Sequence, residues 1–136
     1  MYLLDTNIIS ETIKQAPNKK LIEWLSSVDS QKLYLSVLTL GEIRKGVEKL
    51  VESTAKKQKI TQWLELDLVE LFYGRIINID AIISDKWGYI SFLKNRPAID
   101  GLIAASAIVH NYKLVTRNVK DFEGIPGLEL INPWIF

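Results

Sequence analysis

Short apolar runs alternate along the chain with longer segments in which apolar residues recur at helical spacing. The short runs predict strands at Tyr2–Leu4, Lys32–Val37, Ile76–Ile79, Leu114–Thr116 and Leu128–Ile131. The longer segments predict helices at Asn7–Lys14, Leu21–Val28, Thr39–Val51, Lys57–Phe72, Ile82–Leu93 and Ala98–Asn111. This alternation favours an α/β fold in which parallel strands are joined through right-handed crossovers. Because the chain has no internal repeat and no linker, we expect a single domain over residues 1–136.

An acidic residue ends the first predicted strand, where the apolar run YLL stops at Asp5. Its charge excludes it from the buried strand, so it either caps the next helix or faces a cation. Other acids hold comparable places, since Glu42 and Asp100 lie in the opening turns of predicted helices and Asp121 follows the strand Leu114–Thr116. Sites in parallel sheets lie beyond the carboxyl ends of the strands. We therefore expect these acidic side chains to converge at one edge of the sheet.

Convergence of these acids would indicate a metal site. Each acid alone is explained by the helix dipole, which favours carboxylates near helix N-termini by about 0.3–1 kcal/mol. Carboxylates that lie together raise one another's pKa values and are stable as anions only around a cation. The chain has no cysteine and a single histidine, His110, so the ligands would be oxygen atoms, which suit Mg²⁺ or Mn²⁺. Such ions activate water and stabilise the departing oxygen of a phosphodiester, which indicates metal-dependent phosphoryl transfer to water.

Several other polar residues have structural interpretations. His110, late in an Ala-rich helix, is expected at the surface as a partner of the helix dipole. A single histidine also excludes a metal-free ribonuclease that uses a histidine pair. Asp80 and Asp85 are expected to cap helix Ile82–Leu93. Several lysines are expected to be solvated charges: Lys19, Lys20, Lys56, Lys57 and Lys59.

Four longer segments carry a recognisable family pattern. They are LLDTNIIS at Leu3–Ser10, SVLTLGEIRKGVEKL at Ser36–Leu50, IDGLIAASAIVHNYKLVTRNVKDF at Ile99–Phe122 and GLELINP at Gly127–Pro133. In this order they resemble PIN-domain ribonucleases and, more narrowly, the VapC-type toxin of a bacterial toxin–antitoxin pair. The resemblance implies a PIN-like three-layer domain, with a central, mostly parallel sheet flanked by helices. It also implies a hydrolase, namely a Mg²⁺-dependent endoribonuclease that hydrolyses RNA phosphodiester bonds.

The resemblance assigns the family's acidic motifs to residues of this chain. The implied catalytic and metal-binding residues are Asp5, Glu42, Asp100 and Asp121. Asp5 and Asp100 would be the principal ligands of Mg²⁺, for which Mn²⁺ would substitute, and the other two acids would complete the coordination directly or through water. Short polar side chains that would fix the acidic loops or orient water are Thr6, Asn7, Thr116 and Asn118.

Basic residues near the acids are candidates for RNA contact. The 17 basic and 16 acidic residues give a net charge of +1. An RNA substrate would therefore be met by a local basic patch rather than by a basic protein. The residues that would neutralise phosphates, on the helix of Glu42 or beside Asp121, are Arg44, Lys45, Lys49, Arg117 and Lys120.

The pattern of apolar residues also bears on partners. Helices Thr39–Val51 and Lys57–Phe72, which include Trp63, have apolar faces that exceed what one small domain covers. The remainder would serve a homodimer or a bound antitoxin peptide, and the family resemblance implies both a homodimer and a cognate antitoxin. No apolar run approaches the roughly 20 residues of a transmembrane helix, so no membrane association is expected. The N-terminus lacks a secretory leader and the chain lacks cysteine, which together favour a cytoplasmic protein.

Other classes of function remain as alternatives. A phosphoacceptor receiver domain also has an aspartate at a strand end, but its paired acids and late lysine are not evident here. A haloacid-dehalogenase-type phosphatase would have a second aspartate two residues after the first, where this chain has Asn7. The non-enzymatic alternative is a catalytically inactive PIN-like scaffold that binds RNA or protein. Titration with Mn²⁺ distinguishes it from the enzyme, because a scaffold would show no carboxylate-dependent binding.

Overall fold

A computed structural model describes residues 1–52 and 54–135 of the chain. Its centre is a five-stranded sheet in the order β3-β2-β1-β4-β5, in which every neighbouring pair runs parallel. The strands are β1 (Tyr2–Leu4), β2 (Leu33–Ser36), β3 (Ile76–Ile77), β4 (Lys113–Val115) and β5 (Leu130–Ile131). Each strand predicted from the sequence is present, with ends that differ by about one or two residues. The predicted parallel α/β sheet is confirmed.

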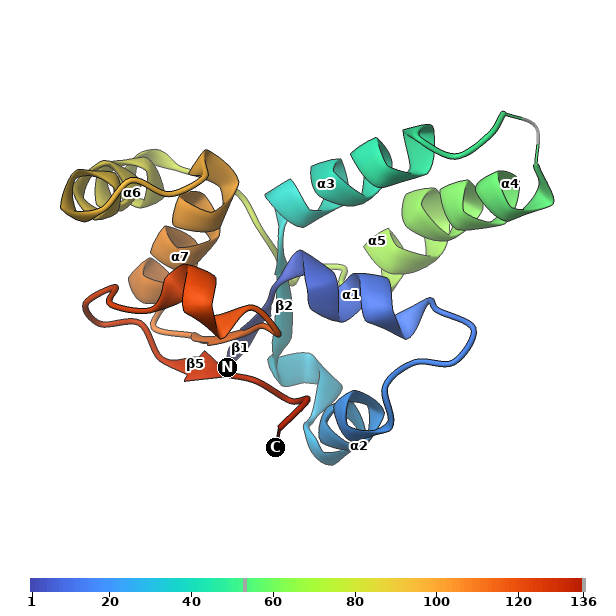
Figure 1. Cartoon of the computed structure of the whole chain (residues 1–136), viewed down its shortest axis with the longest axis horizontal. Helices are drawn as coiled ribbons and strands as arrows, with labels where there is room; N and C mark the ends of the chain where they lie inside the picture. Colours follow the sequence, from blue (N-terminus) through green and yellow to red (C-terminus); the bar gives the residue numbers. More distant parts are fainter. Residues whose placement is uncertain (53, 136) are drawn as a thin grey trace.

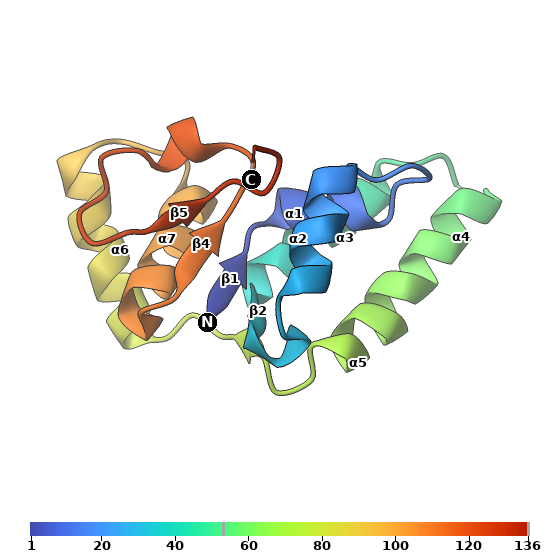
Figure 2. The ribbon, with the colours of Figure 1, turned by 90° about the horizontal axis from the view of Figure 1, so that it is seen from below.

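Helices cover both faces of this sheet. They are α1 (Thr6–Thr12), α2 (Lys19–Ser27), α3 (Val37–Glu48), α4 (Ala55–Gln62), α5 (Val69–Leu71), α6 (Ala81–Leu93) and α7 (Ala98–His110). Short helical segments are η1 (Ser30–Lys32), η2 (Trp63–Leu68) and η3 (Val119–Phe122). Figure 1 shows α6 and α7 on one side of the strands and α1 to α5 on the other. The view from below separates the same two groups across β4, β1 and β2 (Figure 2), so the molecule has three layers.

Two hydrophobic cores lie on either side of the sheet, because successive residues of a strand point to opposite faces. Leu4 and Val115 belong to the core on the α1–α5 side, which also buries Trp24 of α2. Leu3 and Leu114 belong to the core shared with α6 and α7. The same alternation determines which face of the sheet each residue points to at the ends of β1 and β4, where the chain continues into the loops.

Helix α7 packs closely against α6 because its buried residues are small. Ala104, Ala105 and Ala107 have no exposed surface. At Gly101 a Cβ atom would lie 2.9 Å from Cδ1 of Trp87 on α6, a distance that ordinary side chains do not reach. The missing side chain lets α6 and α7 approach each other at the end of α7 that carries Asp100.

Two details differ from the sequence predictions. The predicted helix Lys57–Phe72 is one helical run, but its middle segment η2 is a π-helix that buries Leu64 and Leu68. Their spacing of four residues fits an α-helix and a π-helix alike, so the pattern gave no sign of the change. Asp80 does cap α6, because its side chain accepts the N–H of Ile83 at 2.9 Å. The prediction that Asp85 also caps this helix is wrong, since α6 begins at Ala81 and Asp85 lies inside it.

None of the helices in the described part of the chain is long and apolar enough to cross a membrane.

Candidate active site

The carboxyl ends of β1 and β4 form the centre of the candidate site. Leu4 pairs with Val115 in parallel register, so Asp5 and Thr116, which follow them, leave the sheet side by side. Thr116 Oγ1 donates to Asp5 Oδ2 at 2.8 Å, and Asp5 is only 7% exposed. The backbone N–H of Thr6 donates to Asp5 Oδ1 at 2.8 Å. Asp5 therefore caps α1 with one oxygen and is held by Thr116 at the other.

The loops after β1 and β4 are tied to each other around Thr116. Asn7 Nδ2 lies 3.3 Å from Asp5 Oδ2 and 3.3 Å from Thr116 Oγ1. The backbone N–H of Arg117 donates to Asn7 Oδ1 at 3.3 Å, and that of Asn118 donates to Thr116 Oγ1 at 3.1 Å. These bonds connect the sequence-predicted supporting residues to Asp5 and to one another.

Glu42 is held by the first residue of α1. The Thr6 hydroxyl donates to Glu42 Oε1 and lies 3.1 Å from the hydroxyl of Thr39. Thr39 is fully buried and lies three residues before Glu42 on α3. Thr39 was not among the predicted site residues, because it is uncharged. Its spacing from Glu42 was the available signal, since residues three apart share one face of a helix.

Asp100 and Asp121 reach the site from other elements. Asp100 lies in the first turn of α7, and Asp121 lies in η3, exposed at the surface. Burial, followed by the negative charges of the other three acids, raises the pKa of Asp100 from 3.8 to about 6. Desolvation disfavours the charged form of a carboxyl group, and neighbouring anions disfavour it further. Asp100 is thus within electrostatic range of each of the other acids.

The pKa of Asp5 is also raised. Burial is the largest cause, the hydrogen bonds from Thr116 and Thr6 oppose it, and the charges of Glu42 and Asp121 add to it. The negative charge of Asp5 is one of the causes that raise the pKa of Asp100. In a group of coupled carboxyls, the last one to lose its proton does so beside the charges of all the others, and its pKa is raised most. The structure therefore brings the sequence-predicted acids into one electrostatic neighbourhood.

The donor atoms of this neighbourhood fit a hard divalent cation. All are carboxylate or hydroxyl oxygens, which Mg²⁺ and Mn²⁺ prefer, and a cation would relieve the repulsion that adds to the effect of burial on the pKa values. Within residues 1–52 and 54–135, no three His, Cys, Asp or Glu side chains already form a group that could hold a metal ion. Mg²⁺ usually keeps several waters and takes one or two carboxylates. A site in which water completes the coordination is therefore compatible with this arrangement.

The basic residues on α3 differ in their surroundings. Arg44 forms ion pairs with Glu65 of η2 at 2.6 Å and with Glu48 at 3.4 Å, so its guanidinium links two helices. Lys45 is exposed on α3, and Lys49 is exposed at the residue that follows it. These lysines are therefore freer than Arg44 to contact RNA phosphates.

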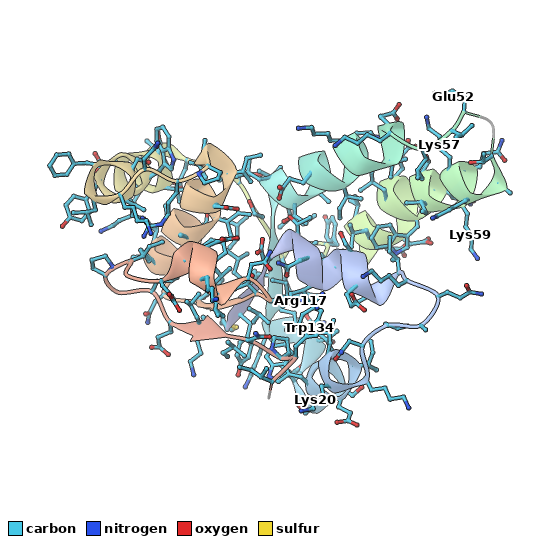
Figure 3. All side chains as sticks on the ribbon, in the orientation of Figure 1. Lys20, Glu52, Lys57, Lys59, Arg117 and Trp134 are labelled. Carbon is cyan, nitrogen blue, oxygen red and sulfur yellow. The ribbon has the colours of Figure 1, made fainter. Side chains whose placement is uncertain are left out.

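Near the loop after β4, Arg117 and Lys120 are also exposed. The guanidinium carbon of Arg117 lies 5.2 Å from the centre of the Trp134 ring, and both side chains are labelled in Figure 3. A stacked guanidinium keeps N–H groups available at its edge.

The expectation that Lys57 is a solvated charge is wrong. Lys57 is 8% exposed, and its amino group pairs with Glu52 at 2.7 Å across the turn between α3 and α4 (Figure 3). It also donates to the carbonyl oxygen of Leu50. His110, by contrast, is exposed at the C-terminus of α7, as expected.

Residues 2–128 match the family model of the PIN domain. The chain belongs to the PIN-domain family. Among relatives of this PIN domain, the toxin FitB of Neisseria gonorrhoeae is 36% identical over 139 residues, which span 98% of this chain and 99% of FitB. The VapC ribonuclease Y4jK of Sinorhizobium fredii is 33% identical over 140 residues, spanning 98% of each chain.

Solved structures agree with this assignment of the PIN domain. The crystal structure of FitAcB from Neisseria gonorrhoeae aligns with a TM-score of 0.91 and 35% identity over the whole of both chains. A toxin–antitoxin complex from Klebsiella pneumoniae aligns with a TM-score of 0.75 and 28% identity over 98% of both chains. The resemblance to PIN domains inferred from the sequence motifs is thus confirmed.

Proposed function

We propose that this PIN domain is a Mg²⁺-dependent endoribonuclease and the toxin component of a bacterial toxin–antitoxin pair. The observation that carries the proposal is the group of acids at the carboxyl end of the sheet, where burial and then the charges of neighbouring acids raise the pKa values of Asp5 and Asp100. The names of two relatives, a VapC ribonuclease and a toxin, support it. We further propose that residues 1–136 form one domain that acts in the cytoplasm, where its RNA substrate would be found.

In this proposal, Asp5 and Asp100 are the principal metal ligands, and Glu42 and Asp121 complete the site directly or through water. A bound Mg²⁺ supplies an activated water and neutralises charge on the phosphodiester. The protein's contribution is to orient its carboxylates before substrate arrives. Thr116 fixes one oxygen of Asp5 by donating its hydroxyl proton, and Asn7 and Asn118 hold the Thr116 hydroxyl in place.

RNA would be positioned by cations around this acidic centre. Lys45, Lys49, Arg117 and Lys120 are the proposed phosphate contacts, because all are exposed on or next to the elements that carry Glu42 and Asp121. Arg44 would contribute less directly, since it is engaged with Glu65.

The test is cleavage of RNA by single-carboxylate variants. Asp5→Asn and Asp100→Asn keep the size of each side chain and remove its charge, so both should abolish Mg²⁺-dependent cleavage. Asp85→Asn is the matched control, because Asp85 is an exposed acid on α6 outside the site. Calorimetric titration with Mn²⁺ should show binding to the wild type that Asp5→Asn loses. Undiminished cleavage by both site variants would refute the proposal, and Mn²⁺ binding that ignores the carboxylates would favour the inactive scaffold.

A groove of about 1120 Å³ is the proposed docking site of the antitoxin. It lies between the end of α1 and the α4–η2 run, and its apolar lining includes Ile60 and Trp63. Lysines surround these apolar groups, at Lys14, Lys56 and Lys59, and Lys59 projects from α4 in Figure 3. The lining also includes the acidic Asp67, but its three lysines outnumber it, so the groove fits an antitoxin segment that combines aliphatic and acidic side chains. Co-expression with the product of the neighbouring reading frame should give a complex that Trp63→Ala weakens.

A second copy of the chain is the proposed partner of α6. This helix exposes a group of large apolar side chains on its surface: Ile82, Tyr89, Phe92 and Leu93, with exposures of 67%, 54%, 84% and 44%. A two-fold symmetric contact would use this patch twice, which suits a helix that exposes it along its whole length. Phe92→Glu should convert a dimer into a monomer in sedimentation experiments. A dimer that persists in this variant would contradict the proposed interface.

A further inference from the structure

We propose that the hydroxyl group of Thr39 is a positioning group for Glu42 and acts through Thr6. The inference rests on the proposed function, because Glu42 is one of the carboxylates assigned to the metal site. It concerns a residue outside the acidic motifs. Thr39 is buried inside the first turn of α3, and its hydroxyl lies 3.1 Å from the Thr6 hydroxyl.

The direction of the hydrogen bonds follows from the number of protons available. A hydroxyl group has one proton to donate and two lone pairs with which to accept. The Thr6 hydroxyl lies within hydrogen-bond distance of both Glu42 Oε1 and Thr39 Oγ1. An ionised glutamate only accepts, so the Thr6 proton goes to Glu42 and Thr39 donates to Thr6. The three groups form a series of hydrogen bonds that runs from Thr39 through Thr6 to Glu42.

Because Thr39 is buried, this series of hydrogen bonds depends on its hydroxyl group. Its exposure is 0%, so solvent water has no access to the hydroxyl. Among residues 1–52 and 54–135, Thr6 is the single hydrogen-bond partner of that hydroxyl. Helical threonines often donate to a backbone carbonyl of the preceding turn instead. Thr39 directs its proton across to α1, and no other group in the described residues would replace it.

The position of Thr6 affects two of the proposed metal ligands at once. Its backbone N–H donates to Asp5 Oδ1 at 2.8 Å, and its hydroxyl donates to Glu42. The Thr6 rotamer therefore sets how Glu42 lies relative to Asp5. Without Thr39, the Thr6 hydroxyl is free to rotate, and Glu42 loses a fixed partner. Groups that orient metal ligands in this way commonly change metal affinity by about 10–100-fold when they are removed.

The first experiment measures Mn²⁺ affinity by calorimetry, without RNA. Thr39→Val keeps the branched shape and removes the hydroxyl, and we expect it to bind Mn²⁺ about 10-fold more weakly than the wild type. Thr39→Ser keeps the hydroxyl and should bind close to wild-type strength. Thr12→Val is the matched control, because the Thr12 hydroxyl on α1 donates to the carbonyl oxygen of Ile9 at 2.6 Å, away from Glu42. If circular dichroism shows that Thr39→Val is unfolded, Thr39→Ala replaces it.

The second experiment separates positioning from general stability. If Thr39 acts through Thr6, the double variant Thr6→Val/Thr39→Val should bind Mn²⁺ no more weakly than Thr6→Val alone. Additive losses in affinity would overturn the positioning role, as would equal losses in Thr39→Val and Thr39→Ser. Wild-type affinity in Thr39→Val, with binding lost in Asp5→Asn, would overturn this inference and leave the metal site standing. A wild type that does not bind Mn²⁺ would overturn both.

Discussion

Asp100→Asn is expected to stabilise the metal-free protein at neutral pH and to lose this advantage in acid. The carboxyl group of Asp100 has its pKa raised from 3.8 to about 6 by burial and by the neighbouring acids. At neutral pH it is therefore ionised in a place that disfavours its charge. An asparagine has no charge to bury and puts no charge beside Asp5.

The sign of the pH dependence follows from proton binding. Between about pH 4 and about pH 6, Asp100 binds more protons in the folded protein than in the unfolded chain, which lowers stability as the pH rises. Below about pH 4 the group is protonated in both states, and its burial carries no electrostatic penalty. Above about pH 6 it is ionised in both states, and the full penalty applies. The benefit of Asp100→Asn should therefore grow from about pH 4 to about pH 6 and then stay constant.

The magnitude is set by the shift and by the exposure of the group. A pKa raised by about 2 corresponds to about 3 kcal/mol for a fully desolvated group, at about 1.4 kcal/mol for each tenfold change in proton affinity. Asp100 is only partly buried, and solvent screening lowers this figure to about 1 kcal/mol. For a protein of this size, such a difference moves the midpoint of thermal unfolding by about 4 °C.

The assay is thermal unfolding followed by circular dichroism in the presence of a chelator. The difference in midpoint between Asp100→Asn and the wild type should be about 4 °C larger at pH 7.5 than at pH 4. Excess Mn²⁺ should stabilise the wild type at pH 7.5 and have little effect on the variant. Asp85→Asn, in which the acid is exposed, should show no such pH dependence. A difference between Asp100→Asn and the wild type that is the same at both pH values would refute the electrostatic reasoning.

Further substitutions test other parts of the structure. Thr116→Val removes the donor that lies 2.8 Å from Asp5 Oδ2, so calorimetry should show Mn²⁺ affinity reduced by about 10-fold or more; unchanged affinity would contradict the orienting role. Trp24→Ala empties a site that is 3% exposed, and urea unfolding should show a loss of about 3–5 kcal/mol. Gly101→Ala places a Cβ against Trp87, so the fluorescence of that tryptophan should change and the midpoint of thermal unfolding should fall.

Much of the fold could be predicted because the signals are local. The strand before Asp5 is a short apolar run, and Asp80 caps α6 directly before its first residue, Ala81. The positions of the acids after strands and in first helical turns indicated which edge of the sheet would hold them. The prediction for Lys57 was wrong because nothing near it in the sequence shows that α3 and α4 pack together and leave its side chain buried.

The remaining features of the site depend on contacts between residues far apart in the sequence. The hydrogen bond from Thr116 to Asp5 joins residues 111 positions apart, and the bond from Thr6 to Glu42 spans 36 positions. Such pairs leave no periodic trace in one chain. The spacing of Thr39 from Glu42 places both on one face of α3, but the contact between Thr39 and Thr6 joins residues 33 positions apart and is visible only in the fold.

The order of the strands along the chain determines when the site can form during synthesis on the ribosome. The central strand β1 is made first, but its neighbour β4, with Thr116, emerges only after more than a hundred further residues. A nascent chain that has passed Glu42 therefore holds two of the four proposed metal ligands without the strand that orients Asp5. Domains fold as units during synthesis, so this nuclease would stay inert on the ribosome until the segment through Asp121 has left the exit tunnel.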